Sequence, residues 1–92
     1  MGYFPFFVDL EGREGLVVGG GAVALRKLQK LLPYGPRLTV AAPELLAEIE
    51  ALPGLTRLRR SFAPAMLEGK RFVIAATDDR EVNREIAALC RE

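Results

Sequence analysis

Apolar residues fall along the chain in two patterns, short continuous runs and runs with a helical repeat. The continuous runs cover residues 15–18, 37–41 and 72–76, and each is rich in Val, Leu, Ile or Ala. Runs of this length and composition are typical of buried strands. A weaker, arginine-bearing strand is predicted over residues 55–62, and an extended segment over residues 4–10.

The helical repeat occurs in three places. Leu25, Leu28 and Leu32 predict a helix over residues 22–32, which Pro33 should stop. A short helix is expected over residues 45–52 and at most a helical turn over residues 65–67. The last helix begins near residue 80 and runs to the end of the chain, with an apolar face of Val82, Ile86 and Leu89.

Strands that alternate with helices predict an α/β fold, a mainly parallel sheet with helices on both faces. Right-handed crossovers then give the strand order 3-2-1-4. A chain of 92 residues has material for one domain but not for a complete six-stranded dinucleotide fold. We therefore expect residues 1–92 to form a single Rossmann-like dinucleotide-binding domain that is incomplete at its C-terminus.

Composition narrows the range of partners. Thirteen basic and twelve acidic residues leave a net charge of +1, so nothing favours nucleic acid or a membrane as a partner. The N-terminal apolar stretch predicts neither a signal peptide nor a membrane span. The one cysteine cannot form an internal disulfide, and the lack of histidine makes a metal site implausible. A chain without disulfides favours a reducing compartment, so we expect a cytoplasmic protein. Cys90 itself is expected to be a small buried residue.

A glycine run follows the first buried strand. Residues 19–24 fit the pattern G-x-G-x-x-A between a strand and a helix, with Gly19 in the tight turn. At Gly21 any side chain would keep the backbone away from a pyrophosphate. Gly20, Ala22 and Val23 complete a loop whose N–H groups and helix dipole suit an anion, although a ligand-free turn is the simpler alternative.

Charged residues elsewhere allow two interpretations each. Asp78 and Asp79 stand where the fourth strand ends, so either could cap the last helix or contact a ligand. Arg57, Arg59 and Arg60 could bind substrate carboxylates, but protection of an edge strand is the better explanation in the outermost position.

Three segments together resemble one family. FPFFVDL at residues 4–10, VVGGGAVALRK at residues 17–27 and AATDDREVN at residues 75–83 are similar to the NAD-binding domain of siroheme synthase, that is, of precorrin-2 dehydrogenase. The segments have the same order and similar spacing in that family and cover nearly the whole chain. The resemblance implies NAD-dependent oxidation of precorrin-2, a tetrapyrrole, to sirohydrochlorin. Many members of the family also insert ferrous iron.

The resemblance also implies roles for individual residues. Dinucleotide contacts fall on Ala22 and Val23 after the glycines and on Pro43 and Glu44 after the second strand, while Thr77 and Asp78 adjoin the same crevice. The catalytic aspartate of the family falls beyond Glu92, so no residue of this chain is assigned as the general base. A homodimer is expected, because missing downstream elements leave a strand edge open.

One position departs from the common dinucleotide pattern. About twenty residues after the first glycine an acid usually binds the ribose hydroxyls, but Ala41 and Ala42 stand there and Glu44 is the nearest acid. NAD is therefore chosen over NADP mainly on the resemblance. Two alternatives remain, a nucleotide-sensing regulatory module and an inactive relative that serves in binding or assembly.

Overall fold

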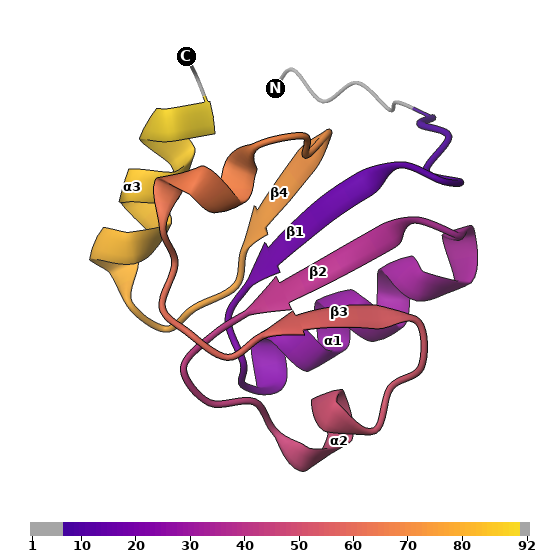
Figure 1. The fold of residues 1–92 in the computed structure, drawn as a ribbon, viewed down its shortest axis with the longest axis horizontal. Coiled ribbons are helices and arrows are strands. Elements are labelled where there is room, and N and C mark those ends of the chain that lie inside the picture. The colour runs from indigo at the N-terminus through magenta and orange to yellow at the C-terminus, as the bar shows by residue number, and fades with distance from the viewer. Residues whose placement is uncertain (1–6, 91–92) are drawn as a thin grey trace, which may run out of the picture.

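The computed structural model describes residues 7–90, which form one four-stranded parallel sheet with the order β3-β2-β1-β4 (Figure 1). This order and the alternation of strands with helices confirm the predicted Rossmann-like fold. The strands are β1 (Glu14–Val18), β2 (Arg37–Ala41), β3 (Leu55–Leu58) and β4 (Phe72–Ala75). The helices are α1 (Ala22–Leu31), α2 (Ala47–Glu50) and α3 (Arg80–Cys90), with 3₁₀ segments η1 (Leu32–Tyr34) and η2 (Pro64–Leu67).

Strand β1 lies at the centre because its side chains are apolar on both faces. Val17 pairs with Val40 of β2 on one side and with Ile74 of β4 on the other. Leu16, Val17 and Val18 are almost completely buried. Full burial of a Val or Leu side chain contributes about 1.5–3 kcal/mol, so this run fixes which strand occupies the middle of the sheet.

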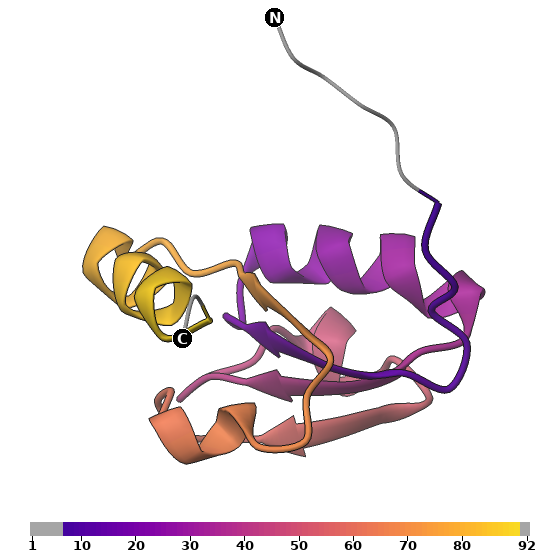
Figure 2. The same cartoon turned by 90° about the horizontal axis from the view of Figure 1, so that it is seen from above.

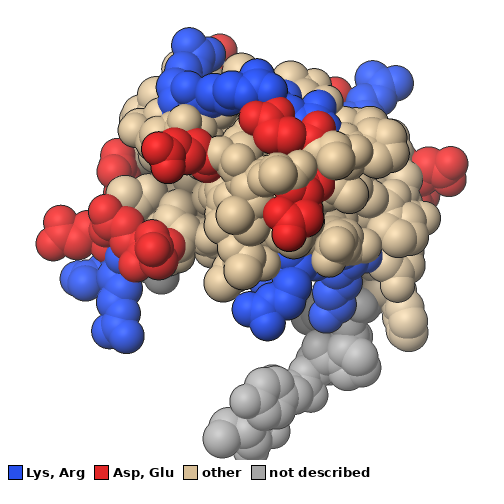
Figure 3. All heavy atoms as spheres, turned by 90° about the horizontal axis from the view of Figure 1, so that it is seen from below, with Lys and Arg blue, Asp and Glu red and all other residues tan. Residues whose placement is uncertain are grey.

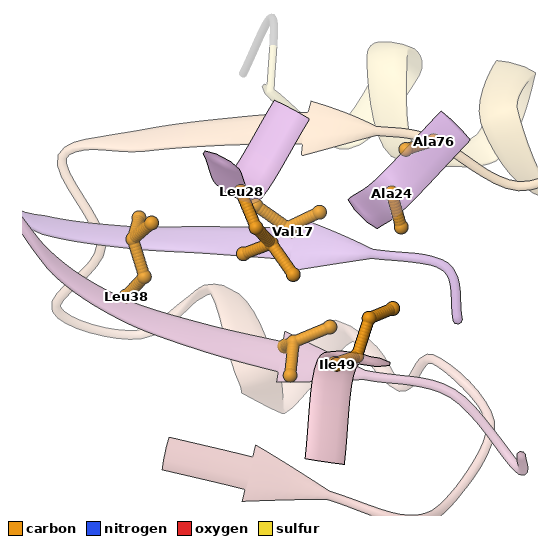
Figure 4. Close-up of a cluster of buried hydrophobic side chains, with 7 residues drawn as sticks. Val17, Ala24, Leu28, Leu38, Ile49 and Ala76 are labelled. Atoms are coloured by element: carbon orange, nitrogen blue, oxygen red, sulfur yellow. The ribbon is translucent and has the colours of Figure 1, made fainter. Parts of the chain in front are cut away.

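Two apolar clusters sandwich the sheet. On the face covered by α1 and α2, Ala24, Leu28 and Ile49 pack on Val17 and Val40 (Figures 2 and 4). On the opposite face, Met66 of η2 and Ile86 of α3 pack on β1 and on Ala41 of β2. Helices therefore cover both faces, and the sheet separates two small cores.

Helix α1 ends at Leu31, before Pro33 as expected, and Pro33 lies in the first turn of η1, where no N–H donor is needed. Three other segments differ from the sequence prediction. Strand β3 ends at Leu58 and not at residue 62, and α2 is a single turn. Residues 7–10 form no strand; the rest of the expected extended segment, residues 4–6, lies outside the described residues.

The expectation for Cys90 was wrong, since its side chain is exposed. Helix α3 buries only Ile86 completely, so the last turn lies beyond the cover that the sheet provides. Among the described residues no helix is long and apolar enough to span a bilayer.

Candidate dinucleotide site

The carboxyl ends of β1, β2 and β4 meet around a crevice with a volume of about 750 Å³. Its floor is the glycine loop and the start of α1. One side is residues 42–46, which follow β2 and which we call the β2 wall; the other is residues 76–78, which follow β4 and which we call the β4 wall. Parallel sheets bind ligands at such a switch point, where the neighbours of one strand diverge.

The first glycine allows the chain to turn close to β4. Gly19 has a φ of 138°, a conformation that residues with a side chain rarely adopt. A Cβ atom at this position would overlap the carbonyl oxygen of Ala76. The main chains at the ends of β1 and β4 are therefore in direct contact, with no room for a side chain between them.

Gly20 is required for a different reason. A Cβ atom here would overlap the carbonyl oxygen of Glu44, so the loop packs directly against the β2 wall. The Leu46 N–H donates to the Gly20 carbonyl over 2.9 Å, and this bond joins the same two segments. The sequence pattern leaves the second position free, yet in this chain packing demands glycine there as well as at Gly19.

Gly21 stands in open space and begins α1 as its N-cap. A Cβ atom at Gly21 would meet nothing within 4 Å, and its φ of −102° is ordinary. No side chain caps the helix and its first turn contains no acid. The N–H groups of Ala22 and Val23 therefore face the crevice with the positive end of the helix dipole, which suits a phosphate.

The β2 wall contributes one charged side chain to the crevice. Ala41 and Ala42 are buried and carry no polar group for the ribose hydroxyls. Pro43 and Glu44 are exposed and line the cavity. Glu44 is therefore the acid that the structure brings to the place where a ribose acid is expected.

Hydrogen bonds at the start of α3 show which aspartate caps this helix. The Asp79 carboxylate accepts hydrogen bonds from the N–H groups of Glu81 (2.9 Å) and Val82 (3.3 Å). Asp79 is the N-cap of α3, whereas Asp78 lines the crevice and has no hydrogen-bonding partner for its carboxylate among the described residues. The cap and the candidate ligand contact thus fall on adjacent residues.

Asn83, in the first turns of α3, was not selected from the sequence. Its amide donates to the Thr77 carbonyl over 3.1 Å, and its Oδ1 accepts from the Thr77 hydroxyl over 2.7 Å. The Asp79 N–H donates to the same hydroxyl over 3.1 Å. Asn83 closes the segment 75–83 that resembles the family, but that segment does not indicate a role for it, and the fold reveals its contact with the β4 wall.

Arg57 of β3 and Arg59, just after this strand, lie outside the crevice and form contacts with α2 and the residues that follow it. The Arg57 guanidinium donates to the carbonyls of Ile49 and Leu52, at the C-terminal end of α2. Arg59 Nε donates to Glu50 Oε2 over 2.9 Å, and this hydrogen bond, more than the accompanying charge attraction, lowers the pKa of Glu50 and raises that of Arg59. These contacts agree with the edge-strand interpretation rather than with substrate binding.

The molecular surface agrees with the balanced composition. Seen from the side of β3 and α2, basic and acidic side chains are interspersed without a large area of one sign (Figure 3). Within residues 7–90, no group of three or more acidic or cysteine side chains is placed to hold a metal ion.

The structure brings all the residues selected from the sequence to one crevice. They are Gly19, Gly20, Gly21, Ala22, Val23, Pro43, Glu44, Thr77 and Asp78. The remaining lining consists of apolar residues, Ala42, Leu45, Leu46 and Ala76. The open space at Gly21 and the free N–H groups of α1 fit the pyrophosphate of a dinucleotide.

Comparison with known proteins decides the family. Residues 6–92 match a sequence family described as "Putative NAD(P)-binding". The chain belongs to that family. Its cofactor is accordingly a nicotinamide dinucleotide.

Individual relatives are similar over nearly the whole chain. The siroheme synthase of Chromobacterium violaceum is 50% identical over 91 residues, which cover 96% of this chain and 19% of the relative. That of Thioalkalivibrio sulfidiphilus is 44% identical over 95 residues, covering 100% of this chain and 19% of the relative. The solved structure of SirC, a precorrin-2 dehydrogenase, superposes with a TM-score of 0.85 at 36% identity, over 92% of this chain and 44% of that one. The chain therefore spans about a fifth of the siroheme synthases.

Proposed function

We propose that this chain is the cofactor-binding part of an NAD-dependent precorrin-2 dehydrogenase in siroheme formation. The observation that carries the proposal is the crevice in which the uncapped N-terminus of α1 meets the ends of three parallel strands. The names of the relatives supply the reaction, because siroheme synthases and a precorrin-2 dehydrogenase share this part of their sequence and fold. We propose that residues 1–92 form one incomplete domain.

Each part of the cofactor has a place in this arrangement. The N–H groups of Ala22 and Val23 receive the pyrophosphate, and the absence of a side chain at Gly21 lets it approach. The adenosine ribose lies against Pro43 and Glu44 of the β2 wall. A carboxylate at Glu44 accepts hydrogen bonds from ribose hydroxyls and repels a 2′-phosphate, which is the reason to propose NAD and not NADP.

The bound cofactor supplies a hydride acceptor, and this chain supplies the place where it is held. Oxidation of precorrin-2 to sirohydrochlorin removes a hydride, which reduces NAD to NADH, and a proton, which needs a base. Asp79 is engaged in capping α3, and we assign no described residue of the crevice as the general base. We propose that the base and the tetrapyrrole-binding surface lie in the part of the siroheme synthases that this chain does not span.

Assembly and location complete the proposal. Strand β4 pairs only with β1 among the described strands, and its apolar residues remain half-buried. Open edges of this kind favour association, so we propose a homodimer for the working enzyme.

Cys90 is an exposed free thiol, which a reducing compartment preserves. We therefore propose the cytoplasm.

The cofactor site is tested with Gly21→Asp. The new carboxylate would block the approach of the backbone and repel the pyrophosphate, so NAD affinity measured by calorimetric titration should fall by about 100-fold or more. Ala87→Asp adds the same charge at an exposed position of α3, away from the crevice, and should bind NAD as the wild type does. Unchanged affinity in Gly21→Asp would refute the site.

The proposal that this chain binds the cofactor but lacks the general base is tested by its activity. NADH formation with precorrin-2 should be slow or absent with this chain alone, because general acid–base assistance is worth about 100- to 10,000-fold. A version extended through the downstream part of a siroheme synthase should restore it. Rapid turnover by the short chain that is lost in Asp78→Ala would place the base in the crevice after all.

A further inference from the structure

We propose that Asn83 is a positioning residue that holds the β4 wall in the shape that receives the nicotinamide half of the cofactor. This inference rests on the proposed function of the crevice. Asn83 does not line the crevice, so its effect on the cofactor would pass through Thr77 and Asp78, which do.

Both polar atoms of the Asn83 side chain form hydrogen bonds with the β4 wall. Its Nδ2 donates to the Thr77 carbonyl (3.1 Å) while its Oδ1 accepts from the Thr77 hydroxyl (2.7 Å). The hydroxyl in turn accepts from the Asp79 N–H (3.1 Å). One side chain of α3 thereby fixes both the main chain and the side chain of Thr77, and orients the following peptide units.

The β4 wall has few other supports. It continues an edge strand, since β4 pairs with β1 alone among the described strands. Its main-chain link to the neighbouring strand is one hydrogen bond, from the Ala76 N–H to the Val18 carbonyl over 2.8 Å. Gly19 packs on the main chain at Ala76, but beyond it no described strand lies beside the chain, so the side-chain contacts of Asn83 and Thr77 support the rest of the wall.

The order of the strands indicates which half of the cofactor is affected. In the proposed site the N-terminus of α1, at the end of β1, would hold the pyrophosphate, and the β2 wall would hold the adenosine. β4 is the other neighbour of β1, so the nicotinamide half must extend toward the β4 wall. A change in Thr77 and Asp78 should therefore disturb NAD more than a ligand that ends at the pyrophosphate.

The experiment compares NAD with ADP, which contains the adenosine and the pyrophosphate but no nicotinamide half. Asn83→Leu removes both hydrogen bonds while keeping the number and branching of the side-chain heavy atoms. We expect NAD affinity to fall about tenfold and ADP affinity to change by less than about twofold. Asn83→Asp keeps the acceptor for the Thr77 hydroxyl but sets a carboxylate oxygen against the Thr77 carbonyl, so it should also bind NAD more weakly.

Ile86→Val is the control for a general loosening of α3, because it removes a methyl group from the buried contact of the helix without touching the wall. It should change NAD and ADP affinity equally or not at all. Hydrogen exchange gives a second readout, since the Asp79 amide should exchange faster in Asn83→Leu than in Ile86→Val.

The outcomes separate the two proposals. Wild-type protein that binds neither ligand would overturn the proposed function together with this inference. If the wild type binds NAD but Asn83→Leu keeps the wild-type ratio of NAD to ADP affinity, the site stands and the positioning role is refuted.

Discussion

The two walls of the crevice are held by different kinds of contact. The β2 wall is fixed by main-chain packing, in which Gly20 lies against the Glu44 carbonyl and accepts a hydrogen bond from Leu46. The β4 wall packs on the Gly19 main chain at Ala76, but beyond that residue it is fixed by side chains, through Asn83, Thr77 and the Asp79 cap. Side-chain substitutions should therefore leave the first wall in place and alter the second.

The position of each strand in the sheet explains this difference. β2 has β1 on one side and β3 on the other, and the Ala42 N–H beyond its end still donates to the Leu58 carbonyl over 3.1 Å. β4 has a single described neighbour, so its continuation finds fewer main-chain partners. Where the sheet cannot supply hydrogen bonds, residues of the next helix supply them.

The largest effect is expected from Gly20→Ala. Its methyl group would overlap the Glu44 carbonyl, a main-chain atom that cannot turn aside, so the stability should fall by about 3 kcal/mol. Urea unfolding measures this loss. Gly21→Ala, with open space and an ordinary φ, is the matched control and should stay within about 0.5 kcal/mol of wild type. Equal losses would show that main-chain packing does not hold the β2 wall.

A smaller effect is expected from Glu44→Arg, which changes the charge on the β2 wall without moving it. The preference between NAD and NADP should shift by about tenfold toward NADP, equivalent to about 1.4 kcal/mol. Titration of both cofactors checks this, with Glu48→Arg on the exposed face of α2 as the control. Wild-type protein that binds NAD and NADP equally would leave Glu44 without a role in selection.

Asp79→Ala tests the side-chain support of the β4 wall. Loss of an N-cap typically costs about 1 kcal/mol, and the free energy of unfolding should fall by that amount. Asp78→Ala should have almost no effect on stability, because the Asp78 carboxylate has no partner among residues 7–90. If the two variants are equally destabilised, the assignment of the cap to Asp79 is wrong.

The smallest effect is expected from the exposed pair behind the β2 wall. Arg59 lowers the pKa of Glu50 below its ordinary value of 4.5, so the pair stabilises the fold above that value and loses its effect as the pH falls through the lowered pKa. Glu50→Gln should be slightly less stable than wild type at neutral pH, and the difference should vanish as the pH falls through the lowered pKa of Glu50. Urea midpoints over a series of pH values measure this, with Glu48→Gln as the control. NAD affinity should not change, and a loss would mean that the ion pair supports the wall.

Much of the fold follows from local pattern. The run of Leu16, Val17 and Val18 is apolar on both faces and predicts a central strand, and the handedness of crossovers then gives the strand order. The end of β3 could not be predicted in this way. Arg59 leaves the strand because it pairs with Glu50, nine residues earlier, and that contact depends on where α2 lies.

The candidate site, like the fold, could be predicted from the sequence only where its features are local. The glycine pattern predicts this candidate crevice because the roles of its first and third positions are local, a turn and an open approach. The need for glycine at Gly20 arises from a wall that is distant in sequence. The choice between Asp78 and Asp79 as the cap, and the contact of Asn83, depend on the angle at which α3 leaves β4, which no local pattern encodes.

The uncapped start of α1 has a consequence for mutational robustness. Its anion-binding groups are the N–H groups of Ala22 and Val23, which belong to the main chain and are present whatever side chain stands there. They do not titrate, so their capacity to hold a phosphate is constant across the working pH range. Proline is the only residue that lacks this donor. Variation at these positions can therefore remodel the surface of the site while the recognition of phosphate persists.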